Sequence, residues 1–288
     1  MKTVLVTASD SGYFALLEDW LASLAAVPEG ERPDIGVLDL GLLDDQRRAL
    51  VAAGVQVVTP DWDVDFPDRA SKPRTYLAQL ARPFLPKYFP AHEVILWIDA
   101  DCWVQEPVAL FWLASAAASG RLVIAQELHS AYWRNYKRSG IYGKYFFYDR
   151  FFGAKEAEEF GFTPSLNVGV LALRADAPHW KPWQETLSRI LAQESTFYAE
   201  QLALDHAVYT GGLPATWLPA RANWLCHLAT PWYCPQRRRF VEPTPPFDPL
   251  WVLHLTMATK DMAFNVPSTF GGEVRTGLRH RQVGALLG

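Results

Sequence analysis

EVILWIDADCWV, residues 93–104, joins a continuous apolar run to two carboxylates in a chain of 288 residues. The run Val94–Ile98 is typical of a strand that is buried on both faces, as in a parallel sheet. In open α/β sheets ligands bind beyond the carboxyl ends of the strands, which is where Asp99 and Asp101 follow. Residues two apart on an extended chain point to the same side, so both carboxylates can address one divalent cation.

Strand and helix patterns alternate on both sides of this run. Three earlier apolar runs predict strands at Val4–Val6, Ile35–Leu40 and Val55–Val58. The two intervening segments have apolar residues at helical spacing, and Gly54 is placed to cap the second helix. This alternation predicts βαβ units and therefore an α/β protein. Further along, the pattern predicts a strand at Leu166–Leu173 and helices near Trp183–Gln193 and Glu200–Tyr209.

Composition and charge exclude several classes of protein. The chain has 27 basic and 31 acidic residues and a net charge of −4, so we expect no nucleic-acid partner. Its three cysteines form no CxxC pair, which argues against a disulfide framework or a zinc ribbon and favours the reducing cytosol. The N-terminal sequence lacks the apolar core of a secretory signal, and the longest apolar run, Val108–Ala118, is too short to span a bilayer. We therefore expect a soluble, cytoplasmic protein.

The chain has neither a dinucleotide-binding GxGxxG after the first strand nor a GxxxxGK phosphate loop. Six other motifs occur in order along it. The motifs are ASDSGY (8–13), RPFLPKYFP (82–90), DAD (99–101), LNVGVLAL (166–173), EQLALD (200–205) and HLTMATK (254–260). Together they resemble the GT-A glycosyltransferases of family 8, a retaining group that includes glycogenin and bacterial lipopolysaccharide galactosyl- and glucosyltransferases. The resemblance covers most of the chain and implies the GT-A fold, in which helices flank a Rossmann-like mixed sheet.

The resemblance implies a UDP-sugar donor and a manganese cofactor, with Mg²⁺ as the alternative cation. Asp99 and Asp101 of the Asp-x-Asp motif would bind the metal together with His254, and Lys260 would hold the diphosphate. This set is chemically coherent, because two carboxylates and an imidazole suit Mn²⁺ and a lysine offsets the charge left on the UDP product.

The other motifs of the resemblance would complete a donor site. Asp10 would contact the uracil or ribose, Tyr13 would stack on the uracil, and Gln201 would sit under the reacting sugar. The residues expected to bind the donor are Ala8, Asp10, Tyr13, Arg82, Asp99, Ala100, Asp101, Asn167, Gly169, Gln201, His254 and Lys260, of which Gln201, Asn167 and Arg82 are the expected catalytic residues. Asn223 matches a further asparagine of the family pattern.

Two residues depart from that pattern. Met257 replaces a glycine between His254 and Lys260, so we expect that loop to approach the diphosphate less closely. Leu202 stands where many family members have an acidic residue, so a double displacement through that carboxylate is not available. Front-face attack, with the leaving diphosphate as the base and Gln201 supporting the oxocarbenium-like sugar, is the mechanism that the sequence favours.

A single catalytic domain is expected over residues 1–265, followed by a tail over 266–288 that contains a short helix. Within the domain, the aromatic and basic segment 129–152 has the position of an acceptor-side loop. Its aromatic residues would stack on sugars of the acceptor or flank a hydrophobic aglycone, and the candidates are Trp133, Tyr136, Tyr142 and Tyr145. A homodimer interface, or a loop packed on the sheet, is an equally weighted alternative.

Other questions stay open at the level of sequence. Arg237–Arg239 and the aromatic residues around them would suit peripheral contact with anionic lipids at the inner membrane face, although a solvated loop is favoured. The acceptor is a glycan, a protein or a small molecule. A non-catalytic GT-A-like binding or scaffold protein is the main alternative function, but its mark would be the loss of metal ligands. A phosphohydrolase of the haloacid dehalogenase type fits less well, because its Asp-x-Asp follows the first strand.

Overall fold

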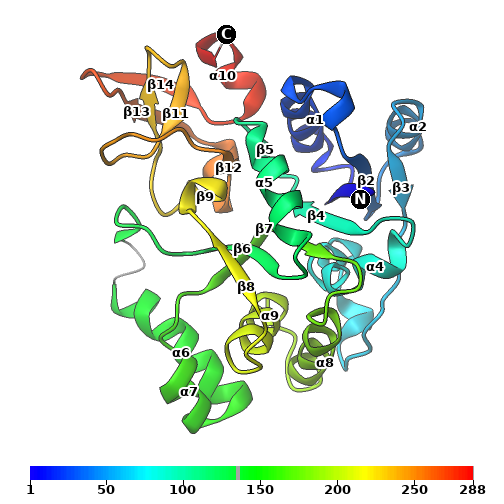
Figure 1. Cartoon of the computed structure of the whole chain (residues 1–288). Coiled ribbons are helices and arrows are strands. Elements are labelled where there is room, and N and C mark those ends of the chain that lie inside the picture. Colours follow the sequence, from blue (N-terminus) through cyan, green and yellow to red (C-terminus); the bar gives the residue numbers. More distant parts are fainter. Residues whose placement is uncertain (134–136, 288) are drawn as a thin grey trace.

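The computed structural model describes residues 1–133 and 137–287 and shows a seven-stranded sheet with helices on both faces (Figure 1). The strand order is β3-β2-β1-β4-β7-β6-β8. These strands are β1 (Thr3–Ser9), β2 (Asp34–Asp39), β3 (Gln56–Val58), β4 (Val94–Ile98), β6 (Leu122–Gln126), β7 (Leu166–Arg174) and β8 (Ala215–Leu218). The strands β1 to β4 are parallel to one another, whereas β7 is antiparallel to both β4 and β6. The predicted α/β class with a mixed sheet is thus confirmed.

The two faces of the sheet are covered by different helices. Along β4, Val94, Leu96 and Ile98 belong to a core under α1 (Phe14–Ser23), α2 (Asp44–Ala52) and α5 (Val108–Ala117). The alternate residues Ile95 and Trp97 belong to a second core on the opposite face. That core is closed by α3 (Leu77–Leu80), α4 (Leu85–Tyr88), α6 (Arg138–Phe152), α7 (Ala154–Phe160), α8 (Trp180–Leu191) and α9 (Ala199–Tyr209). Burial on both faces explains why β4 reads as an unbroken apolar run.

Beyond β4 the chain enters a second, three-stranded sheet with the order β5-β12-β9. Its strands are β5 (Cys102–Val104), β9 (Trp224–Leu225) and β12 (Val252–His254). Because β5 follows the Asp-x-Asp motif directly and pairs with β12 in antiparallel register, it brings the C-terminal third of the chain to the carboxyl end of β4. Two hairpin-like pairs flank this sheet, β10 (Trp232–Cys234) with β11 (Arg239–Val241) and β13 (Ala263–Pro267) with β14 (Glu273–Gly277).

The C-terminal segment packs against the rest of the chain. β13 crosses the expected boundary at residue 266, and α10 (His280–Leu287) follows β14. Arg279 Nε and Arg281 Nε donate to the two carboxylate oxygens of Asp19 in α1, at 2.8 and 2.7 Å. These contacts place α10 beside α1 (Figure 1). The division into a catalytic domain and a tail stays a prediction.

Much of segment 129–152 is helical, whereas the sequence suggested a loop. α6 spans its second half, and Tyr148 and Phe151 lie in the core. Residue Tyr136 of the expected acceptor platform lies outside the described residues. Neither α6 nor any other helix in the described part of the chain is long and apolar enough to cross a membrane.

Gly36 in β2 allows a close approach between the sheet and the ring of Phe89. A Cβ added at Gly36 would lie 2.4 Å from Phe89 Cε1, which is fully buried. We therefore expect Gly36→Ala to destabilise the protein by about 1–3 kcal/mol through overpacking, measured by urea unfolding. Gly30→Ala is the matched control, because a Cβ there meets nothing within 4 Å. Equal midpoints for the two variants would contradict this account.

Candidate active site

The register of the small sheet brings His254 to the two aspartates. His254 is the direct partner of Cys102 across the β5–β12 pair, and the backbone N–H of Leu255 donates to the carbonyl of Asp101 at 2.8 Å. His254 Nε2 consequently lies 3.3 Å from Asp101 Oδ1 and 3.7 Å from Asp99 Oδ2. The structure thus brings together the three residues expected to bind a metal, although 153 positions separate His254 from Asp101 in the sequence.

The other nitrogen of His254 fixes the orientation of its ring. Nδ1 lies 2.9 Å from Asn223 Oδ1, an acceptor, so Nδ1 carries a proton and Nε2 faces the carboxylates. Burial lowers the pKa of His254, but Asp101 and Asp99 together raise it above its ordinary value. A cation bound between these groups would take the place of the proton on Nε2. An imidazole held in this way by a partner on its far side is typical of metal-binding histidines.

Cys102 is a member of the same cluster that the sequence did not single out. Donor atoms of Asp101, Cys102 and His254 all lie within 4.8 Å of one another. Burial raises the pKa of the Cys102 thiol, and the neighbouring Asp101 and Asp99 raise it further. The thiol therefore stays protonated in the free protein, and the carboxylates and imidazole fit a hard or borderline cation such as Mn²⁺.

Lys260 is anchored beside the metal ligands. Its Nζ donates to Asp101 Oδ2 at 3.0 Å and to the carbonyl of Met257 at 2.8 Å, and it lies 5.6 Å from the centre of the Tyr13 ring. Although burial raises the pKa of Asp101, His254 and Lys260 lower it to about 2. Asp101 is consequently a carboxylate at every ordinary pH.

Met257 adopts a backbone conformation that favours glycine, with a φ of 59°. Met257 is the residue that stands in place of a glycine in the pattern of the resemblance, and the expectation that its loop approaches the diphosphate less closely stays a prediction. Its side chain is 72% exposed and therefore does not enter the cluster.

Arg82 is a buried cation that holds Asp99 from one side. Its guanidinium donates to Asp99 Oδ1 at 3.0 Å and to Glu200 Oε2 at 2.9 Å, and it lies 5.0 Å from the centre of the Trp97 ring. Trp97 Nε1 also donates to Asp99 Oδ1, at 2.7 Å. These bonds occupy Oδ1, so Oδ2 is the Asp99 oxygen that faces His254.

A chain of hydrogen bonds connects His254 to the residues expected at the sugar. Asn223 Nδ2 donates to Asn167 Oδ1 at 2.8 Å, and Asn167 Nδ2 donates to Glu127 Oε1 at 2.8 Å. The same Glu127 oxygen lies 3.5 Å from Gln201 Nε2. Asn167 and Gln201 are therefore brought together around one acidic group.

Glu127 and Glu200 were not among the predicted site residues. Burial raises the pKa of Glu127, and it raises the pKa of Glu200 to about 7 despite the lowering effect of Arg82. Glu200 directly precedes Gln201, which offered a signal in the sequence, whereas Glu127 stands alone after a strand and offered none. Leu202, on the other side of Gln201, is buried in the core.

The residues expected at the nucleotide base surround the end of β1. Asp10 Oδ1 accepts a hydrogen bond from the backbone N–H of Tyr13 at 2.8 Å, which closes the turn before α1. Tyr13 is 42% exposed, so part of its side chain is open to solvent. Ala8 and Ala100 are buried.

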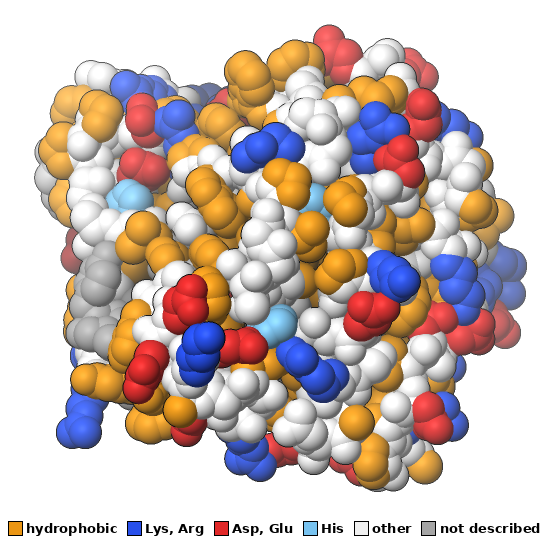
Figure 2. All heavy atoms as spheres, turned by 60° about the horizontal axis from the view of Figure 1, so that its bottom comes forward, with side chains coloured by type: hydrophobic (Ala, Val, Ile, Leu, Met, Phe, Trp, Pro, Cys, Tyr) orange, Lys and Arg blue, Asp and Glu red, His pale blue; other side chains and the backbone are white. Residues whose placement is uncertain are grey.

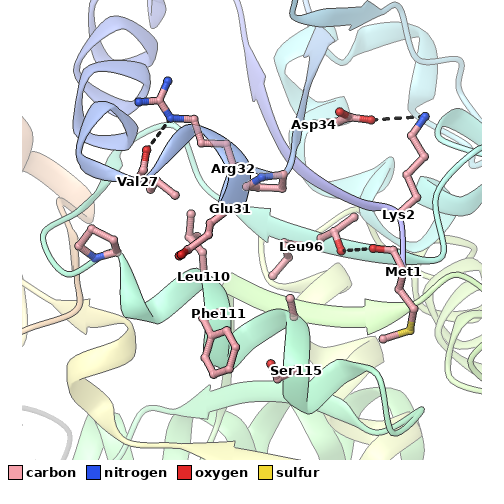
Figure 3. A pocket seen from close by; sticks show the side chains of 15 residues that line it. Met1, Lys2, Val27, Glu31, Arg32, Asp34, Leu96, Leu110, Phe111 and Ser115 are labelled. Carbon is pink, nitrogen blue, oxygen red and sulfur yellow. Dashed lines mark hydrogen bonds and ion pairs between the residues drawn. The ribbon is translucent and has the colours of Figure 1, made fainter.

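A cavity of about 630 Å³ lies at the opposite edge of the sheet (Figure 3). It is lined by residues at the amino ends of β1 and β2, by Leu96 of β4 and by Leu110 and Phe111 of α5. Arg32, at its rim, donates to the carbonyl of Val27 at 2.7 Å, and Lys2 pairs with Asp34. Since Asp99 and Asp101 follow the carboxyl end of β4, this cavity is separate from their cluster.

Gly169 gives His254 the space that it occupies. A Cβ at Gly169 would lie 2.2 Å from His254 Cε1 and 2.7 Å from Nδ1. We expect Gly169→Ala to displace the imidazole and weaken Mn²⁺ binding by roughly 10–100-fold, measured by calorimetry. Gly143→Ala is the control, since a Cβ there meets nothing within 4 Å. Unchanged Mn²⁺ affinity in a folded Gly169→Ala protein would contradict the position assigned to His254.

Comparison with known proteins gives a fold but no sequence family. No family model matches the chain, and no curated protein matches it in sequence. Among solved structures, the galactosyltransferase LgtC in complex with donor and acceptor sugar analogs is similar with a TM-score of 0.56 and 17% identity, over 89% of this chain and 88% of that chain. An active-site mutant of LgtC is similar with a TM-score of 0.53 and 18% identity, over 87% of this chain and 86% of that chain.

A third similar structure is the bifunctional glycosyltransferase WbbM in its apo form. Its TM-score is 0.58 and its identity 13%, and the match covers 88% of this chain but 46% of the larger WbbM chain. The chain therefore has the GT-A fold that these glycosyltransferases share.

Proposed function

We propose that this protein is a retaining glycosyltransferase that moves a hexose from a UDP-sugar to an acceptor with the help of a bound divalent cation. The observation that carries the proposal is the convergence of Asp99, Asp101 and His254, with Lys260 beside them, at the carboxyl edge of a GT-A fold. A fold alone does not define a reaction, whereas this donor set suits a metal and an anionic diphosphate.

The metal, Mn²⁺ or Mg²⁺, would be held by Asp99, Asp101 and His254 and would offset the negative charge of the diphosphate. Lys260 lies within hydrogen-bond distance of Asp101, and its ammonium group would bind a phosphate oxygen of the diphosphate. Tyr13 and Asp10 would receive the base and ribose at the end of β1. Arg82 is only 6% exposed, so it would orient Asp99 from within the protein.

Transfer would proceed on the front face of the sugar. The bond between the anomeric carbon and the diphosphate breaks, and the acceptor oxygen attacks from the same side and gives its proton to the departing phosphate oxygen. Gln201 would support the positive charge that develops on the sugar through its amide oxygen, because its Nε2 is directed to Glu127. Leu202 offers no carboxylate for a covalent intermediate.

The alternative of a non-catalytic binding or scaffold protein has no specific observation in its favour. Each residue expected to bind the metal is present, and each lies in the cluster. A phosphohydrolase of the haloacid dehalogenase type would have its nucleophilic carboxylate after the first strand, whereas Asp99 follows β4.

The donor site can be tested by calorimetric titration of UDP into the protein with Mn²⁺ and again with EDTA. We expect binding that depends on Mn²⁺ and that Asp101→Asn weakens at least about tenfold, or about 1.4 kcal/mol. Asp261→Asn, an exposed carboxylate one residue after Lys260, is the control and should bind as the wild type does. Equal UDP binding in Mn²⁺ and in EDTA would overturn the metal-dependent donor site.

The role of Gln201 can be tested by turnover with donor and metal saturating. We expect Gln201→Ala to lower kcat by about 10²–10³-fold while UDP affinity is kept, because the amide would act on the transition state. Gln193→Ala, at an exposed position after α8, should keep full turnover. If Gln201→Ala also kept full turnover, the assigned role would be wrong.

A further inference from the structure

Cys102 lies where the core of the protein meets the metal cluster. Its side chain is 2% exposed and belongs to the core under α1 and α5. A buried free cysteine often serves only as a small apolar residue. Here, however, donor atoms of Asp101, Cys102 and His254 all lie within 4.8 Å of one another. The thiol therefore has a carboxylate and an imidazole within reach, which are partners that cysteine shares in zinc sites.

The backbone explains why the side chains of two neighbouring residues converge. The N–H of Cys102 donates to the carbonyl of Asp99 at 2.9 Å, which closes a turn between β4 and β5. Asp101 lies within this turn, and Cys102 begins β5. Across the β5–β12 pair, Cys102 is directly opposite His254, so both side chains point to the same face of the small sheet. The turn and the register together bring the three donors to one point.

The separations of the donor atoms are close to those of a tetrahedral zinc site. Zn²⁺ binds nitrogen and oxygen at about 2.0–2.1 Å and thiolate sulfur at about 2.3 Å, so a tetrahedron places nitrogen and oxygen about 3.3 Å apart and sulfur about 3.6 Å from each. His254 Nε2 and Asp101 Oδ1 are 3.3 Å apart. Because the sulfur lies within 4.8 Å of a donor atom of each residue, a shift of roughly 1 Å would complete the set.

The fourth position of the tetrahedron is left to Asp99 or to solvent. Asp99 Oδ2 lies 3.7 Å from His254 Nε2, whereas Oδ1 accepts hydrogen bonds from Arg82 and Trp97. Zinc bound in this way would have at most one open position. Mn²⁺ prefers six ligands, mainly oxygen, and would leave the thiol of Cys102 aside. The same few residues can therefore provide two different coordination spheres.

Histidines near the surface form a different kind of site. Histidine side chains are visible at separate places on the surface that Figure 2 shows. One pair of this kind in the chain is His206 Nε2 with Glu156 Oε2, at 2.7 Å. Zinc held at the surface would have no thiolate ligand, because each of the three cysteines is buried. A thiolate ligand thus distinguishes the Cys102 site from zinc bound adventitiously.

We propose that Asp101, Cys102 and His254 form a zinc site in which Cys102 binds as a thiolate, and that Zn²⁺ bound there excludes Mn²⁺. When Zn²⁺ binds, the S–H bond of Cys102 breaks, a zinc–sulfur bond forms and the proton leaves to the solvent. Both cations need Asp101 and His254, so one excludes the other. The effect on the donor rests on the proposed function: zinc with at most one open position would not chelate a diphosphate through two oxygens.

Co²⁺ is the probe for the thiolate, because it replaces Zn²⁺ in tetrahedral sites and absorbs light. We expect Co²⁺ added to the full chain to give a sulfur-to-cobalt charge-transfer band in the near ultraviolet, which added Zn²⁺ abolishes. Cys102→Ala should remove the band and weaken Zn²⁺ binding at least about 100-fold, since a ligand contributes more than the 10–100-fold of an outer-shell partner. Zn²⁺ affinity is measured by competition with a coloured chelator.

Cys234→Ala is the matched control. It removes another buried thiol, in β10, and should keep both the cobalt band and the Zn²⁺ affinity. Cys102→Ser, which keeps the size of the side chain, is the second variant if the alanine protein does not fold. Thermal unfolding identifies the variants that fold as the wild type does.

Displacement of Mn²⁺ is the second measurement, followed by the paramagnetic resonance signal of the free ion. Zn²⁺ should release bound Mn²⁺ from the wild type. Zinc is preferred over manganese at most nitrogen and oxygen sites, so the preference alone does not report the thiol. We therefore expect Cys102→Ala to lower the ratio of the two affinities by about the factor that it removes from Zn²⁺ binding.

The outcomes separate the zinc site from the proposed function, because zinc and cobalt are titrated without nucleotide. Cobalt bound without a charge-transfer band, a band that persists in Cys102→Ala, or zinc and manganese bound together would overturn the zinc site. UDP binding with Mn²⁺ that Zn²⁺ leaves unchanged would reject the effect on the donor. The thiolate band together with no UDP binding in Mn²⁺ would support the zinc site and reject the proposed function.

Discussion

The buried guanidinium of Arg82 is the constraint on which the geometry of the site depends. Removing such a cation from water costs several kcal/mol unless carboxylates pair with it in good geometry. Here Asp99 and Glu200 do so, and they come from the end of β4 and from the first turn of α9. The pairing therefore fixes the position of α9, and with it Gln201, relative to the Asp-x-Asp motif. It also determines which oxygen of Asp99 remains for a ligand.

The cluster contains more acidic groups than cations. Its hydrogen bonds involve four carboxyl groups, those of Asp99, Asp101, Glu127 and Glu200. Among the described contacts of this cluster, the Lys and Arg side chains are those of Arg82 and Lys260. Burial raises the pKa of both Glu127 and Glu200, and the neighbouring carboxylates Asp205 and Asp99, respectively, raise it further. The pKa of His254 is raised for the complementary reason, since a proton there reduces the excess of negative charge. A divalent cation would serve the same purpose more completely, which is the physical basis for expecting one.

The sequence predicted the large sheet better than the small one. Runs such as Val94–Ile98 are buried on both faces, so composition alone marks them as strands. By contrast, β5, β9 and β12 are only two or three residues long, too short for any periodicity to appear. The pairing of Cys102 with His254 was therefore not predictable from spacing, and His254 was identified through the resemblance instead. Glu127 was missed for a related reason, because its role depends on contacts with β7 and α9 rather than on its neighbours in the chain.

Met257 has a backbone conformation that favours glycine, although the residue has a side chain. A residue with a side chain at φ 59° costs about 1–2 kcal/mol relative to a relaxed conformation, which glycine would avoid. The chain accepts this cost where Lys260 Nζ is bound by the carbonyl of Met257 and by Asp101. If the turn relaxed to negative φ, that carbonyl would rotate away and Lys260 would lose one of its two closest partners. The strained turn is thus better explained by the placement of Lys260 than by packing, because the Met257 side chain itself is exposed and contributes little to the core.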